Sequence, residues 1–226
     1  MSLRPIPSDV LTLLGLLETG TPPPSSAFAV VEKAGADVLF TAPHAVCHYT
    51  ATSPRRVKGS DIGTKELAFS AAAKYGCAAL ATQSPWQGNA NADPVERCVF
   101  KTRVLHLLKS GLMQGVVDVH GMSDEHGLDV CVGSGGADTT LAHSVADVLT
   151  AAGFVVAVDK PFSASRSGTV TRTVTEAGFA AAQIEVSAAV RTSQQPRLLD
   201  ALEMVVDLFP SRALSKARSG SKHRRI

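Results

Sequence analysis

Short apolar stretches alternate along this chain with longer segments in which apolar residues recur at helical spacing. The short stretches predict β-strands at 28–32, 37–41, 77–82, 115–120, 128–132, 154–158 and 181–186. The longer segments predict helices at 9–18, 60–75, 93–110, 139–152 and 196–208. Local signals agree with these bounds, since Ser60 is suited to cap its helix, Pro94 to open the next and Gly153 to end the one after.

The alternation of strands with helices carries a prediction about the fold. It implies βαβ crossovers, and therefore a mostly parallel sheet with helices on both faces. We predict an α/β fold on this basis. In such sheets ligands bind at the carboxyl ends of the strands. Polar residues that end or follow a strand are therefore the first candidates for a functional site.

Composition limits the class of protein and its organisation. Of the 226 residues, 45% are apolar and 19% are charged, which excludes a disordered or fibrous chain. The length suggests one domain, which we place at 1–210. The remaining segment, 211–226, holds six basic residues and no acidic one, whereas the rest of the chain has 16 basic and 20 acidic residues. We expect a solvated, disordered tail and, because the acidic body shows no basic face, no binding to nucleic acid.

The same sequence favours a cytoplasmic protein. No apolar run approaches the ~20 residues that span a bilayer, so no membrane association is expected. The N-terminus has no apolar signal core. The four cysteines are scattered without a C-x-x-C spacing, which is typical of reduced thiols in the cytoplasm.

Two histidines stand at the ends of different predicted strands. His44 follows the strand at 37–41, and His120 ends the strand at 115–120. Both are expected at the same edge of the sheet, where their imidazole nitrogens suit zinc. Because the cysteines are not grouped, a catalytic site with an open position is favoured over a structural one. Asp61 and Glu66 are the nearest carboxylates after His44, and the sequence leaves the third ligand open between them.

Asp118 and Glu185 are carboxylates within predicted strands for which the sequence suggests a role. Asp118 precedes His120 by two residues and therefore points to the same side of the strand, where it is suited to orient a metal-bound histidine. Glu185 lies in the middle of an apolar strand, where a carboxylate is costly unless it is paired or used. A general base beside a water at the metal is the obvious use for Glu185.

Four short segments, in this order, resemble the N-formylglutamate amidohydrolase family. They are T-A-P-H-A-V (41–46), S-D-I-G-T (60–64), V-V-D-V-H-G-M (116–122) and A-A-Q-I-E-V-S (181–187). The family is similar in fold to the zinc carboxypeptidases. The resemblance therefore implies a three-layer α/β/α sandwich of the phosphorylase/hydrolase-like type around a mixed central sheet.

The resemblance also implies roles for individual residues. Carried over to this chain, it makes His44, Asp61 and His120 the zinc ligands and Glu185 the catalytic residue of a Q-x-E motif. The segment 167–172 resembles a glycine-containing loop of the family that ends in an arginine. Arg172 is accordingly expected to bind a substrate carboxylate, which the fork of a guanidinium fits well.

These observations predict a zinc-dependent hydrolase of a C–N amide bond in a small acyl-amino acid. Its expected partner is a small carboxylate or amide substrate. Two alternatives stay open, namely a small carboxypeptidase-like metallopeptidase with the same metal centre, and a metal-containing binding protein without turnover. The intact set of His44, His120 and Glu185 argues against the binding protein, which has no need of a buried acid beside two histidines.

Overall fold

The computed structural model describes residues 28–31, 37–50, 53–84, 86–87, 89–111 and 113–209. The predicted helix at 9–18 and the predicted tail at 211–226 lie outside these residues. Within them, no helix combines the length and the apolar character that a membrane crossing requires.

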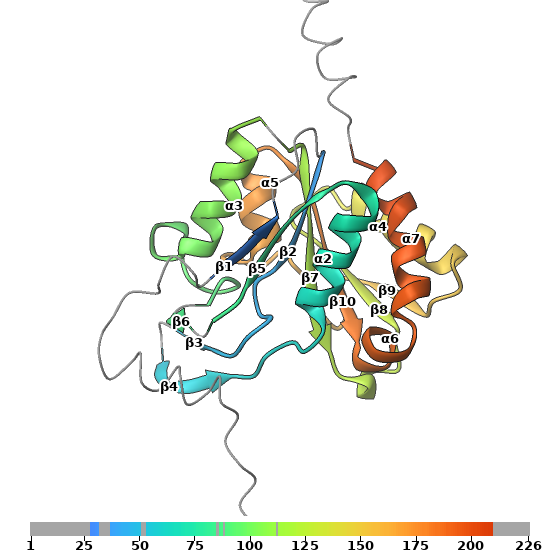
Figure 1. The fold of residues 1–226 in the computed structure, drawn as a ribbon, viewed down its shortest axis with the longest axis horizontal. Coiled ribbons are helices and arrows are strands. Elements are labelled where there is room, and N and C mark those ends of the chain that lie inside the picture. The colour runs from blue at the N-terminus through green and yellow to red at the C-terminus, as the bar shows by residue number, and fades with distance from the viewer. Residues whose placement is uncertain are drawn as a thin grey trace, which may run out of the picture.

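A seven-stranded mixed sheet forms the centre of the molecule, in the order β1-β5-β2-β7-β10-β8-β9 (Figure 1). Its strands are β1 (Phe28–Val31), β2 (Val38–Ala42), β5 (Ala78–Thr82), β7 (Gly115–Met122), β8 (Val130–Ser134), β9 (Val156–Val158) and β10 (Ala180–Ser187). The central strands β5, β2, β7 and β10 are parallel. β1 is antiparallel to β5, and β8 is antiparallel to β10 but parallel to β9. Every predicted strand is present within two residues of its predicted bounds, and the mostly parallel sheet is confirmed.

Helices cover both faces of the sheet, which confirms the three-layer α/β/α arrangement (Figure 1). One face carries α2 (Thr64–Tyr75), α4 (Thr140–Ala151) and α7 (Gln195–Asp207), and the other carries α3 (Val99–Lys109) and α5 (Val170–Glu176). Each face has its own buried apolar cluster. Leu67, Leu149 and Leu202 belong to the first, and Phe100 and Val174 to the second.

Two predicted helices begin later than expected. The helix predicted at 93–110 is divided into a 3₁₀-helix, η2 (Val95–Arg97), and α3, because Cys98 between them is extended with φ −116° and ψ 95°. The helix predicted at 60–75 starts at Thr64, after Gly63 takes a left-handed conformation with φ +87°. Asp61 consequently lies in the loop before α2 rather than in the helix itself.

Several short elements were not predicted. They are α5, α6 (Ala188–Ser193), the 3₁₀-helix η3 (Asp124–His126), and a three-stranded sheet of β3 (His48–Thr50), β4 (Ser53–Lys58) and β6 (Trp86–Gln87). This small sheet begins just after His44, and it lies outside the two helical layers (Figure 1). Apart from α5, which covers one face of the sheet, the unpredicted elements follow the carboxyl ends of β2, β5, β7 and β10 along the chain.

Candidate metal centre

Two histidines and an aspartate meet at the carboxyl ends of β2 and β7. Asp61 Oδ2 lies 3.8 Å from His44 Nδ1 and 3.5 Å from His120 Nδ1. One donor atom from each of the three residues lies within 4.8 Å of the others. Glu66 is an exposed residue in the first turn of α2 and is not part of this group. Of the two carboxylates that the sequence left open, Asp61 is therefore the one that lies beside the two histidines.

Backbone contacts fix the position of Asp61. Its N–H donates to the carbonyl of His44 at 2.8 Å, and its Oδ2 accepts from the N–H of Gly121 at 3.1 Å. Its own carbonyl accepts from the hydroxyl of Thr64, the first residue of α2, at 2.7 Å. These bonds tie the loop before α2 to the ends of both β2 and β7.

The donor set fits a divalent metal with an open coordination position. A tetrahedral zinc ion with ligand bonds of 2.0–2.1 Å places its ligands about 3.4 Å apart. The two distances from Asp61 Oδ2, 3.5 and 3.8 Å, are close to this value. Two imidazoles and one carboxylate are the kind of three-ligand set found in catalytic zinc sites.

The far nitrogen of each imidazole is oriented by a second side chain. His120 Nε2 lies 3.0 Å from Asp118 Oδ2, and His44 Nε2 lies 3.2 Å from Asn89 Oδ1. In both histidines Nδ1 faces Asp61. An acceptor beside Nε2 keeps the proton on Nε2, which leaves the lone pair of Nδ1 available for a metal. His48, which is fully buried, stacks on His44 with ring centroids 4.4 Å apart.

Asp118 is fully buried, yet its carboxylate is well supported. Its Oδ1 accepts from the hydroxyl of Thr41 at 2.6 Å and its Oδ2 from that of Thr171 at 3.3 Å. The pKa of His120 reflects this surrounding. Burial, the largest influence, lowers the pKa, but Asp118, Asp61 and Glu185 together hold it well above its ordinary value. In the metal-free fold, a proton on His120 thus compensates part of the negative charge of these carboxylates. A bound divalent cation would compensate the same negative charge.

Glu185 lies in β10, directly beside His120 on β7 in the parallel register. Its side chain is 9% exposed, and Oε1 accepts from Gln183 Nε2 at 3.0 Å. Glu185 and the three predicted ligands line the same cavity. The apolar strand around Glu185 therefore delivers one carboxylate to the metal centre, as the sequence pattern indicated.

The cavity has a volume of about 530 Å³. Besides the ligands and Glu185 it is lined by Asn91, Gly121, Pro161, Phe162, Ser163, Ser165, Arg166, Thr169 and Gln183. Arg166 is the cationic residue in this lining. Arg172, in contrast, lies on α5, where its Nε donates to Glu176 Oε1 at 2.7 Å, and it lines a different cavity. The structure thus brings together all predicted site residues except Arg172.

One wall of the cavity depends on a buried lysine. Lys101 is 1% exposed, and its ammonium donates to the carbonyls of Asp93 and of Gly168, the latter at 2.7 Å. It joins the loop that carries Asn89 and Asn91 to the loop after β9. Burial lowers the pKa of Lys101. This clamp and Arg166 were missed by the sequence reasoning, because neither residue stands at the end of a strand.

The comparisons with known proteins agree with the motifs. The model of the N-formylglutamate amidohydrolase family matches residues 102–190, a segment that includes His120 and Glu185 but not His44 or Asp61. The match spans less than half of the chain, and it confirms the resemblance to this family of metal-dependent amidohydrolases. No curated protein matches the chain.

Solved structures share the fold at low sequence identity. The N-formylglutamate amidohydrolase from Ralstonia eutropha JMP134 is 15% identical with a TM-score of 0.56, covering 86% of this chain and 99% of that one. A bacteriophage poly-γ-glutamate hydrolase is 18% identical with a TM-score of 0.54, covering 85% and 93%. YNDL in its zinc-free apo form is 18% identical with a TM-score of 0.55, covering 84% and 94%. At these identities the likeness shows the fold alone.

Proposed function

We propose that this protein, a relative of the N-formylglutamate amidohydrolases, is a zinc-dependent hydrolase of an amide C–N bond in a small acyl-amino acid. The observation that carries the proposal is the convergence of His44, Asp61 and His120 with Glu185 on one cavity. A setting in the cytoplasm is part of the proposal, and it is supported by four cysteines that are all buried thiols.

The donor set favours zinc. Zinc, when bound, supplies Lewis acidity, which polarises a carbonyl group and lowers the pKa of water to about 7. His44 and His120 would hold it through Nδ1, and Asp61 through Oδ2. Asp118 and Asn89 keep the two imidazoles in the required orientation through their far nitrogens.

Glu185 is proposed as the general base. Its carboxylate lines the cavity beside His120 and is oriented by the amide of Gln183. From this position it accepts a proton from the attacking water and passes the proton to the leaving nitrogen, which departs as an amine. The buried setting keeps the carboxylate from being fully solvated, and this strengthens its interaction with the reacting groups.

Arg166 is proposed as the residue that binds the substrate carboxylate. It is the cation in the lining of the cavity, and a guanidinium pairs with a carboxylate through two parallel hydrogen bonds. A volume of about 530 Å³ lies within the range of sites for small ligands. The surrounding amide and hydroxyl groups of Asn91, Ser163 and Ser165 are suited to the polar atoms of an acyl-amino acid.

Metal analysis followed by a substrate panel tests the proposal. The purified protein should contain about one zinc per chain, and His44→Ala or His120→Ala should abolish this content. His143→Ala is a matched control, because His143 is exposed on α4 outside the cavity. Full zinc retention in both site variants would show that the ligands are assigned wrongly.

The panel should contain N-formyl and N-acetyl amino acids, γ-glutamyl dipeptides and unblocked peptides. Release of the amine from an acyl-amino acid supports the proposed amidohydrolase. Release of only the C-terminal residue from peptides would indicate the carboxypeptidase-like enzyme instead. Zinc binding without turnover on any member would indicate a binding protein.

A further inference from the structure

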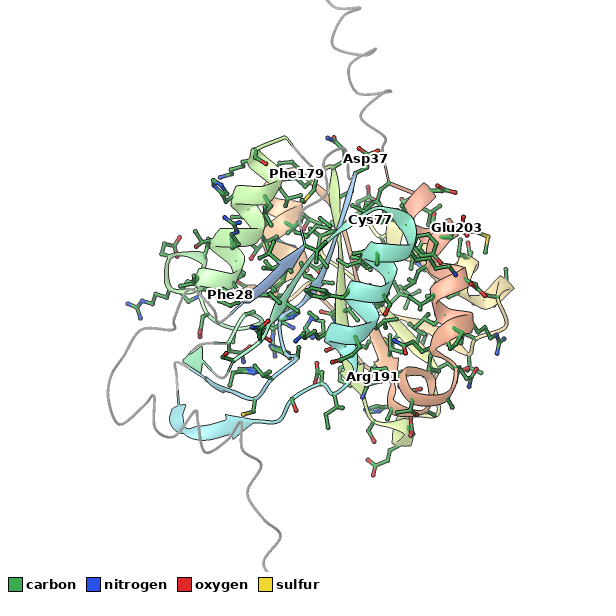
Figure 2. All side chains as sticks on the ribbon, in the orientation of Figure 1. Phe28, Asp37, Cys77, Phe179, Arg191 and Glu203 are labelled. Atoms are coloured by element: carbon green, nitrogen blue, oxygen red, sulfur yellow. The ribbon has the colours of Figure 1, made fainter. Side chains whose placement is uncertain are left out.

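Arg191 binds three backbone carbonyls at the edge of the metal centre. It lies in α6, where β7 and β10 end and α2 begins (Figure 2). Its Nε donates to the carbonyl of Ile62 at 2.8 Å, and its Nη1 donates to the carbonyls of Val186 and, at 3.5 Å, Met122. One guanidinium thus joins three segments that are far apart in the sequence.

Each of the three segments carries a residue of the proposed active site. The carbonyls that accept from Arg191 directly follow Asp61, directly follow Glu185, and stand two positions after His120. Two of these residues are proposed ligands and the third is the proposed base. Arg191 itself is absent from the lining of the cavity, and its hydrogen bonds reach the backbone that carries the site residues. Its positive charge also interacts with the carboxylates of Asp61 and Glu185.

The space for the guanidinium depends on a glycine. A Cβ atom on Gly121 would lie 2.6 Å from Arg191 Nη1 and 2.7 Å from its Cζ, both closer than real Cβ contacts. The N–H of Gly121 also donates to Asp61 Oδ2. The residue that follows His120 therefore contacts both a proposed ligand and the guanidinium.

The shape of the donor explains why an arginine stands here. A guanidinium presents five N–H donors in a fixed plane, whereas a lysine ammonium is a compact point charge on a flexible stem. A lysine at this position cannot reach carbonyls on three separate segments in the same way. Losing the fork leaves carbonyl groups of the strand ends without their donor, and the three segments are then free to shift relative to one another.

We infer that Arg191 is a positioning residue for the metal centre, holding Asp61, His120 and Glu185 in their relative places without contacting the metal or the substrate. The inference rests on the proposed function. A purely structural role, in which Arg191 only attaches α6 to the sheet, would change the stability of the fold but not the affinity for the metal.

Zinc affinity separates these two roles. The full-length protein is stripped of metal, and its zinc dissociation constant is measured by competition with a chromophoric chelator, alongside thermal unfolding of the metal-free form. Arg191→Lys should weaken zinc binding roughly 10–100-fold, the effect typical of residues that orient ligands. The matched control is Arg197→Lys, because Arg197 also binds a backbone carbonyl, that of Ala152, but far from the site. The control should lose stability while its zinc affinity stays at the wild-type value.

Gly121→Ala provides an independent variant that keeps every ligand and the arginine. The new methyl group displaces the guanidinium, so zinc affinity should fall in the wild-type background. In the Arg191→Lys background the same substitution should lower zinc affinity little further, because the atoms nearest to the new methyl group are those of Arg191. Losses that simply add in the double variant would contradict the inference.

The outcomes distinguish this inference from the proposed function. A wild-type protein that binds no zinc would overturn both. Zinc binding by the wild type together with an unchanged affinity in Arg191→Lys, or an equal loss in Arg197→Lys, would overturn the positioning role alone. If Arg191→Lys does not fold, the result with Gly121→Ala decides.

Discussion

Replacing Asp118 with asparagine tests how much the centre depends on a residue that does not itself coordinate. The substitution keeps the volume of a fully buried side chain and removes its charge. The asparagine has one acceptor oxygen in place of two. When this oxygen faces His120 Nε2, it is only a neutral acceptor in place of the carboxylate at 3.0 Å, and the amide NH2 faces the hydroxyl of Thr41, which can accept from it. The imidazole that faces the metal then becomes a weaker and less firmly oriented ligand.

The size of the effect follows from this single contact. A hydrogen bond to a charged group contributes about 1.5–3 kcal/mol and a neutral one about 0.5–1.5 kcal/mol, so the exchange costs roughly 1–1.5 kcal/mol. At about 1.4 kcal/mol for each tenfold change, Asp118→Asn should weaken zinc binding about tenfold. The loss should appear mainly in metal affinity, because the packing around the side chain is retained.

The assay is a chelator competition on the metal-stripped protein, repeated at several pH values. The repetition is needed because Asp118 also raises the pKa of His120, and its removal reduces competition from protons at low pH. Asp129→Asn is the control, since Asp129 accepts from the N–H of Val155 away from the centre. Zinc binding by Asp118→Asn as tight as that of the control at every pH would show that the charge of Asp118 does not strengthen the ligand His120.

Three further predictions address the base, the substrate cation and the metal-free fold. Glu185→Gln should retain zinc and its melting temperature but lose turnover by roughly 10²–10⁴-fold, and near-normal turnover with full zinc would exclude Glu185 as the base. Arg166→Gln should raise KM for a substrate with a carboxylate while Arg172→Gln leaves it close to the wild-type value, and the reverse pattern would return the role to Arg172. The pKa of His120 is raised in the metal-free fold, so its stabilising contribution is complete below about pH 6.5 and is lost as the pH rises through the raised pKa. The melting temperature of the metal-free protein should therefore fall over that range more steeply than that of His120→Gln, and parallel curves would contradict this.

The sequence pattern predicted the parts of the fold that are continuous and apolar. β7 and β10 are almost entirely buried runs with β-branched residues, and both were predicted to within two residues. α5 was missed because its sequence, V-T-R-T-V-T-E, is rich in β-branched residues that disfavour a helix. The helix forms nevertheless, since Thr169 caps it by accepting from the N–H of Arg172 at 3.1 Å and since Val170 and Val174 are buried against the second apolar cluster.

In the site as well, residues at the ends of strands were predictable from the pattern, whereas residues placed by loops were not. His44 and His120 were predictable because parallel strands bring their carboxyl ends to one edge of the sheet. The choice of Asp61 over Glu66 came from the family resemblance and not from the pattern of the sequence, because it depends on the left-handed turn at Gly63, which delays the start of α2. The position of Arg166 depends on the conformation of a long loop, and no periodic pattern in the sequence encodes that conformation.

We propose above that His44, Asp61 and His120 form one zinc site. The most direct test is an anomalous difference map from crystals of the zinc-loaded protein, collected on both sides of the zinc absorption edge. We expect one strong peak per chain, about 2.0–2.2 Å from His44 Nδ1, His120 Nδ1 and a carboxylate oxygen of Asp61. A peak held by other residues, or the absence of a peak at these three side chains, would contradict the proposed site.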